Sequence, residues 1–111
     1  MTDYHPYQFL LVEFTLPDEV LVKCFGRWAG GFASGDSWRL NSGINSVSVD
    51  DDIVRFEGFS GSTYHCYIES YGISSPYALG WLEDRIEQVG LPARIFTEEE
   101  MLTYVKEKTD A

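Results

Sequence analysis

One stretch decides how the chain folds: residues 26–49 read GRWAGGFASGDSWRLNSGINSVSV. It contains five of the ten glycines of the chain, and three of these fall between residues 30 and 37. Glycine can adopt left-handed backbone conformations and lets other groups approach the backbone closely, so this segment is predicted to be a loop between two strands. Trp28 and Trp38 flank the loop. Tryptophan most often contributes to a core, so we expect a long hairpin whose tryptophans close the end of the core.

Strands are predicted on both sides of this loop. Short apolar runs bounded by turn residues predict five strands, at residues 7–15, 20–28, 38–49, 53–59 and 63–69. In the first of them apolar side chains occupy both faces, which predicts that both faces are covered. The apolar alternation slips by one residue at Asn45 and Ser46, which indicates a β-bulge, with Gly43 as the site of the bend. The short connections predict a mostly antiparallel meander of about five strands.

Two helices are predicted in the last third of the chain. Ser75 and Pro76 are typical of the N-cap and the first position of a helix, and Gly90 is typical of its end. Thr97 and Glu100 form a capping-box pattern, which predicts the second helix. Each helix has an apolar stripe, so both are expected to pack on the sheet. The chain is therefore predicted to be a single α+β domain, residues 1–111, with a β-sheet region at 7–69 and a helical region at 75–108.

The composition indicates a soluble protein, and a cytoplasmic location is the expectation. The chain has no apolar run of about 20 residues and no basic start before an apolar run, so neither a membrane span nor a signal peptide is expected. Residues 1–6 are polar and expected to be frayed. Cys24 and Cys66 are separated by 41 residues and lie in predicted strands, which favours reduced, structural thiols over a disulfide. A monomer and a homodimer both remain open.

The charge of the chain indicates the class of its partner. Eight basic and eighteen acidic residues give a formal net charge of −10. Nucleic acid and anionic membrane would repel such a domain, so the expected partner is a basic protein. We expect a non-enzymatic acidic protein that imitates nucleic acid and inhibits a nucleic-acid-binding protein, as phage or bacterial inhibitors of CRISPR or restriction systems do. The acidic residues predicted to contact the partner are Asp36, Asp50, Asp51, Asp52, Glu83, Asp84 and Glu87. The alternative interpretation is a solvated surface that only keeps the domain soluble.

The glycine-rich segment allows a second hypothesis. It has the glycine spacing of a phosphate-binding loop, but Asp36 stands where that motif requires lysine, and a strand follows where the motif requires a helix. Hydrolysis of nucleoside triphosphates is therefore excluded. The remaining alternative is that residues 26–43 bind a small anionic, nucleotide-like ligand by stacking and ion pairing. The residues predicted to contact that ligand are Arg27, Trp28, Gly31, Ser34, Trp38 and Arg39.

Catalysis and metal binding have the least support in the sequence. His65 and Cys66 are adjacent on a predicted strand and therefore point to opposite faces. A pairing of His65 with Cys24 or His5 has no motif spacing behind it, whereas zinc sites usually show short paired spacings. No catalytic residue, metal or other cofactor is predicted, and a hydrolase that uses His65 is the weakest of the three hypotheses.

Overall fold

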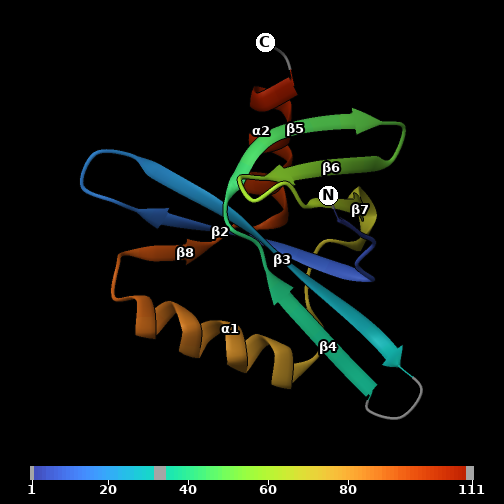
Figure 1. Ribbon diagram of the computed structural model, residues 1–111, viewed down its shortest axis with the longest axis horizontal. Coiled ribbons are helices and arrows are strands. Elements are labelled where there is room, and N and C mark those ends of the chain that lie inside the picture. The colour runs from blue at the N-terminus through green and yellow to red at the C-terminus, as the bar shows by residue number, and fades with distance from the viewer. Residues whose placement is uncertain (1, 32–34, 110–111) are drawn as a thin grey trace.

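Two four-stranded sheets and two α-helices make up residues 2–31 and 35–109, the part of the chain that the computed structural model describes (Figure 1). Sheet A has the strand order β1 (Asp3–Tyr4), β7 (Thr63–Tyr67), β6 (Ile53–Gly58) and β5 (Ile44–Asp50). Sheet B has the order β4 (Gly35–Leu40), β3 (Val20–Gly31), β2 (Gln8–Thr15) and β8 (Ala93–Ile95). The helices are the 3-10 helix η1 (Ile68–Ser70) and the α-helices α1 (Pro76–Val89) and α2 (Glu98–Thr109). The predicted α+β class is confirmed, but the single five-stranded meander is wrong, because the strands divide between two sheets.

The chain passes from sheet B to sheet A in the middle of the predicted strand 38–49. The side-chain Oδ1 of Asn41 accepts hydrogen bonds from the backbone N–H groups of Cys24, at 2.9 Å, and of Gly43, at 3.1 Å. Gly43 has a φ of 128°, which residues with a Cβ rarely adopt. The predicted strand is therefore two strands, β4 and β5. The predicted β-bulge is confirmed, because the register of β5 against β6 shifts near the start of β5.

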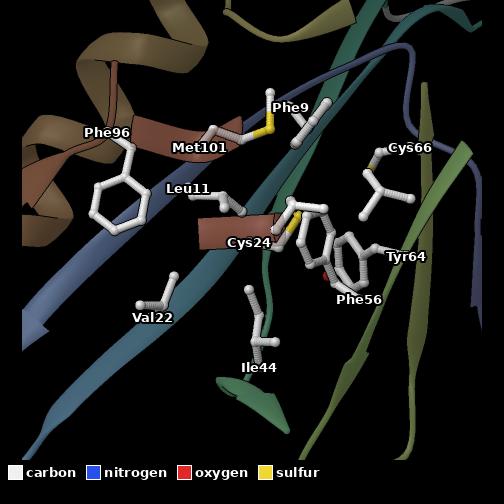
Figure 2. Packing of buried hydrophobic residues seen from close by; sticks show 12 residues of the cluster. Phe9, Leu11, Val22, Cys24, Ile44, Phe56, Tyr64, Cys66, Phe96 and Met101 are labelled. Atoms are coloured by element: carbon white, nitrogen blue, oxygen red, sulfur yellow. The ribbon is translucent and has the colours of Figure 1, made fainter. Parts of the chain in front are cut away.

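Sheet B is the central layer of the fold, and alternate side chains of β2 enter two separate hydrophobic clusters. Those of Phe9 and Leu11 join a cluster that fills the space between the two sheets and is completed by α2 (Figure 2). Those of Leu10, Val12 and Phe14 pack against α1 on the other face of sheet B. The prediction that both faces of this strand are covered is confirmed.

Both helices begin where the capping residues predict. Ser75 Oγ accepts a hydrogen bond from the backbone N–H of Ala78 at 3.3 Å, and Gly90 ends α1 with a φ of 74°. The backbone N–H of Thr97 donates to Glu100 Oε1 at 2.9 Å, and the backbone N–H of Glu100 donates to Thr97 Oγ1 at 3.1 Å, which is a capping box. Helix α1 packs on sheet B, and α2 packs against β5 of sheet A. In this part of the chain no helix is long and apolar enough to span a membrane.

Asp3 and Tyr4, which belong to the segment 1–6 that was expected to be frayed, form a strand. Strand β1 pairs in parallel with β7. Side chains reinforce this pairing, because His65 Nε2 lies 3.0 Å from Asp3 Oδ1 and the rings of His65 and His5 stack with their centres 4.6 Å apart. This segment is held in place by its pairing with a strand that lies about 60 residues later in the sequence.

The glycine-rich segment forms the end of the β3–β4 hairpin, as predicted. Gly31 pairs with Gly35, so both strands extend further into the segment than the sequence indicates. Trp28 packs against the cluster between the sheets, whereas Trp38 packs against the cluster beside α1. The two tryptophans therefore contribute to opposite faces of sheet B. Ser34 lies outside the described residues.

Candidate functional site

A groove lies between α1 and the face of sheet B that β3 and β4 form. Its volume is about 700 Å³, and small-molecule sites usually measure about 300–1,000 Å³. Apolar side chains from both layers make up its walls. They include Phe14, Leu21, Trp38, Leu40, Trp81 and Leu91. By size and lining, this groove is a candidate binding site.

Besides Arg39, two cations line the groove, Lys23 from β3 and Arg85 from α1. Burial lowers the pKa of the Lys23 ammonium below its ordinary value, and the positive charge of Arg85 lowers this pKa further. The two cations are therefore close enough to repel each other. Among the described residues that line the groove, none is an aspartate or a glutamate. This is a locally basic surface on a chain whose net charge is −10.

The sequence of α1 explains why the guanidinium of Arg85 faces aromatic and not acidic neighbours. On a helix, side chains three and four residues apart lie next to each other. For Arg85 these neighbours are Trp81, Leu82, Gln88 and Val89. The guanidinium carbon lies 5.9 Å from the centre of the Trp81 ring. That ring stacks on Phe25 of β3, with centres 5.8 Å apart and planes 13° apart. The stack gives the groove an aromatic wall that carries a positive charge.

Two of the residues predicted to bind a ligand border this groove. Trp38 lines it from β4. Arg39 also borders it, but its guanidinium carbon lies 5.1 Å from the centre of the Tyr4 ring, toward sheet A. Adjacent residues on a strand point to opposite faces, so Trp38 and the charge of Arg39 face different sides of sheet B.

The other predicted ligand residues lie away from the groove. Arg27 is buried, and its Nη1 donates to Gln8 Oε1 at 2.6 Å. Trp28 packs against the cluster between the sheets, and Gly31 is the last residue of β3. Arg27 and Trp28 therefore stabilise the end of sheet B and do not line the groove.

The acidic residues predicted to contact a partner occupy separate places. Glu83, Asp84 and Glu87 are exposed on α1. Residues 50–52 are exposed at the turn between β5 and β6, on the opposite side of the molecule from α1 (Figure 1). Asp36 lies on β4. The six of these residues whose side chains the structure describes fall into two separate groups, so they do not form one continuous acidic face.

The thiol and imidazole groups also lie apart. Cys24 and Cys66 are buried between the sheets as free thiols, as predicted. Burial raises the pKa of the Cys24 thiol well above its ordinary value, and the neighbouring Cys66 thiol raises it further, so Cys24 stays protonated. His65 lies on the other face of β7, where Arg55 Nε donates to His65 Nδ1 at 3.2 Å. Within residues 2–31 and 35–109, no three His, Cys, Asp or Glu side chains are grouped so that they would hold a metal ion.

The sequence interpretation did not assign the cations of the groove. One signal for Arg85 was present, because it follows Trp81 by one helical turn and has no acidic residue three or four positions away. A signal for Lys23 was present too, because it shares a strand face with Phe25. No local pattern indicates that α1 covers this face of β3 and brings the two cations together.

Comparison with known proteins does not assign a function. The chain has no significant match to a family model, to a curated protein or to a solved structure. The groove and the charged surfaces are therefore interpreted from their own chemistry.

Proposed function

We propose that this protein is a binding domain for a small organic anion, which occupies the groove between α1 and sheet B. The observation that carries this proposal is the pair Lys23 and Arg85, which share a partly apolar groove without a lining carboxylate. The flat part of the ligand would contact Trp38 and Trp81, and its negative group would lie between the two cations. This is the small anionic ligand expected from the sequence, placed beside α1 and not in the glycine-rich segment.

Charge repulsion between Lys23 and Arg85 favours such a ligand. Lys23 is partly buried and lies near a second cation, as its lowered pKa indicates. An anion between Lys23 and Arg85 would reduce this repulsion and accept charge-assisted hydrogen bonds, which are about twice as strong as neutral ones. Lys23 is partly buried, so screening by water is weaker at this end of the groove than at the exposed Arg85.

Titration with flat organic anions tests the groove. Aromatic carboxylates and nucleoside monophosphates are expected to bind saturably in calorimetry and to raise the unfolding temperature. Arg85→Gln and Lys23→Gln are each expected to weaken binding by roughly tenfold, the effect of losing one charge-assisted hydrogen bond. The control is Lys106→Gln, which removes an exposed charge from the last turn of α2. The proposal is wrong if no anion of this panel binds, or if Arg85→Gln binds as tightly as the unchanged protein.

We propose, as a second candidate, that the exposed surface of α1 binds a basic protein. Helix α1 has no acidic residue in its first turn and no basic residue in its last turn, and Glu83, Asp84 and Glu87 lie in its second half. The helix dipole disfavours negative charge in the last turn, where Glu87 lies, and gives Glu83 and Asp84 no stabilisation. In α2 the charges are arranged in the opposite and stabilising way, with three glutamates in the first turn and two lysines in the last. The acidic residues of α1 do not stabilise their own helix, which supports a role in binding.

An exposed aromatic residue on the same helix supports the same interpretation. Tyr77 on α1 is 80% exposed, and tyrosine is enriched at protein interfaces. The proposed partner is a nucleic-acid-binding protein of a host defence system, which this domain would inhibit by occupying its phosphate-binding surface, as a phage or bacterial inhibitor would.

Electrostatic attraction makes this second proposal testable by salt. Binding to purified basic nucleic-acid-binding proteins is expected to weaken steeply between low and high salt, because the association of oppositely charged surfaces is screened. The triple change Glu83→Gln, Asp84→Asn and Glu87→Gln is expected to slow association by roughly tenfold or more. The double change Glu98→Gln and Glu99→Gln on α2 is the control. Equal association rates for the α1 and α2 variants would exclude α1 as the contact surface.

A further inference from the structure

A second, smaller cavity lies on the other side of β4, between the end of that strand and the turn that joins β6 to β7. Its volume is about 210 Å³. Almost all of its lining residues carry a hydrogen-bond donor on the side chain. They are Arg39, Asn41, Ser42, Ser60, Ser62 and Tyr64, together with Leu40. Among the described residues that line it, none is acidic. This is the donor set that an oxyanion requires.

In the side-chain amide of Asn41 the oxygen has hydrogen-bond partners and the nitrogen has none among the described residues. Its Oδ1 accepts hydrogen bonds from the backbone N–H groups of Cys24 and Gly43. Its Nδ2 is buried and has no hydrogen-bond partner among the described residues, although Asn41 is only 6% exposed. Nδ2 points toward sheet A, because it lies 3.4 Å from the position that a Cβ on Gly58 would take. A buried donor without a partner indicates that a water molecule or an ion belongs beside it.

Tyr64 contributes a second unsatisfied group to the same cavity. Its side chain is fully buried, and its hydroxyl has no well-formed hydrogen bond in the part of the chain that the structure describes, although it interacts with the Arg39 side chain. Burial raises the pKa of Tyr64 above its ordinary value, and the nearby guanidinium of Arg39 acts in the opposite direction. The hydroxyl is therefore protonated and available to donate at neutral pH. Asn41 and Tyr64 both line the cavity, and each has a buried polar group without a well-formed hydrogen bond, which calls for an explanation such as a bound ion.

The charge of the site comes from Arg39. Its guanidinium lies over the Tyr4 ring, with 5.1 Å between the guanidinium carbon and the ring centre. Tyr4 in turn packs against Tyr64, with ring centres 5.1 Å apart. These contacts hold the guanidinium beside the cavity. The acidic residue next to the turn, Glu57, accepts a hydrogen bond from Ser46 at 3.2 Å and does not line the cavity.

The serines fix the turn that closes the cavity. The hydroxyl of Ser42 donates to Ser60 Oγ at 3.2 Å, and the backbone N–H of Ser60 donates to Ser42 Oγ at 3.0 Å. In this arrangement Ser60 Oγ accepts, and its own hydroxyl can donate to a ligand. The turn that follows β6 is thus tied to the end of β4 by side chains of the cavity itself, so the donors are held in place before a ligand arrives.

We infer that this cavity binds a phosphate-sized tetrahedral oxyanion, held by the charge of Arg39 and by donors from Asn41 Nδ2, the Tyr64 hydroxyl and the serines. The volume is several times the roughly 30 Å³ that one water molecule occupies in the liquid, so a single bridging water does not fill it. The chemistry is that of a phosphate group, either as the free ion or as a monoester. The inference does not depend on the groove beside α1, because the two sites lie on opposite faces of β4 and share only the segment Arg39 to Asn41.

Titration with inorganic phosphate tests the inference, with sodium chloride at the same ionic strength as the reference. Phosphate is expected to bind saturably in calorimetry and to shift the side-chain amide signal of Asn41 in NMR spectra. Arg39→Gln is expected to weaken phosphate binding by roughly tenfold or more, because it removes the charged donor. Tyr64→Phe is expected to weaken it by roughly threefold to tenfold, the value of one neutral hydrogen bond.

Tyr64→Phe also separates an ion site from a structural role. The change removes only a hydroxyl that has no well-formed hydrogen bond and interacts with Arg39 alone, so the protein without phosphate is expected to keep nearly the same stability. Arg85→Gln, in the groove beside α1, is expected to leave phosphate affinity unchanged, which keeps a failure of this inference distinct from a failure of the proposed function. Asn41→Asp is expected to abolish binding, and Tyr64→Phe decides the question if that variant does not fold.

Two results would overturn the inference. One is that phosphate has no effect beyond that of chloride, which would mean that the cavity holds only water. The other is that Arg39→Gln and Tyr64→Phe both bind phosphate as tightly as the unchanged protein. Phenyl phosphate identifies the source of the ion: tighter binding than inorganic phosphate indicates a monoester, and exclusion of phenyl phosphate indicates the free ion.

Discussion

Replacing Leu11 with alanine is expected to lower the free energy of unfolding by about 3–5 kcal/mol. Leu11 is fully buried, and it lies in β2, which pairs with β3 on one side and with β8 on the other. Its side chain packs between the two sheets together with Cys24, Met101 and Phe56 (Figure 2). These neighbours belong to three different elements and cannot all move inward, so a cavity remains. Since small domains are stabilised by only about 5–15 kcal/mol, the loss is a large fraction of the total.

Urea denaturation followed by circular dichroism measures this effect. The control is Leu102→Ala, which removes the same atoms from a side chain on α2 that is 44% exposed and is expected to change stability by at most about 1 kcal/mol. Similar losses for the two variants would mean that β2 is not the central strand of the fold. An unchanged denaturant slope is expected for Leu11→Ala, because its native and unfolded states should expose nearly the same surface.

The features that were correctly predicted from the sequence are those that depend on near neighbours in the chain. Apolar residues on both faces of residues 7–15 indicated a strand covered on both sides, and β2 is such a strand. The cap at Ser75 and the capping box at Thr97 gave the start of each helix, because these hydrogen bonds join residues three positions apart. The β-bulge near Asn45 followed from a one-residue slip in the apolar alternation.

The division into two sheets depends on contacts that no local pattern records. Strand β4 ends before Asn41, whose Oδ1 accepts hydrogen bonds from the backbone N–H groups of Cys24, 17 residues earlier, and of Gly43. A bend at Gly43 was expected. A glycine at this position is compatible both with a bulge inside one strand and with a connection between two sheets, so the sequence alone does not distinguish them. Strand β1 was missed for the same reason, because Asp3 and Tyr4 pair with residues 63 and 64.

The candidate sites were only partly predictable. Trp38 and Arg39 were singled out by the composition of residues 26–49, and both border a cavity. Their partners come from distant elements, namely Lys23 and Arg85 in the groove and Tyr64 in the smaller cavity. The side chains of adjacent residues on β4 point to opposite faces of sheet B. Trp38 and Arg39, which are neighbours in the sequence, therefore contribute to two different sites.

Replacing Tyr71 with phenylalanine is expected to lower the free energy of unfolding by about 2–4 kcal/mol, because two backbone groups lose their partner. The Tyr71 hydroxyl donates to the backbone oxygen of Phe96 at 2.7 Å and accepts from the backbone N–H of Leu11 at 3.1 Å. It therefore links β2 to the segment that leads into α2. Its ring packs edge-on against Phe9, with ring centres 5.0 Å apart, and phenylalanine keeps this contact. The control is Tyr104→Phe, whose hydroxyl has no hydrogen bond within the described residues and whose removal is expected to cost at most about 1 kcal/mol.

The same hydroxyl gives a pH dependence whose sign is fixed. Burial raises the pKa of Tyr71 to about 12, against the hydrogen bond with the backbone of Leu11, which lowers it. The unfolded chain loses this proton near its ordinary value of about 10, whereas the folded protein keeps it. The stabilising contribution is therefore fully present below about pH 10 and decreases as the pH rises toward 12. Tyr71→Phe is expected to show a shallower decrease than the unchanged protein in denaturation at alkaline pH. A variant with the same alkaline decrease and the same stability at pH 7 would mean that the hydroxyl does not bridge Leu11 and Phe96.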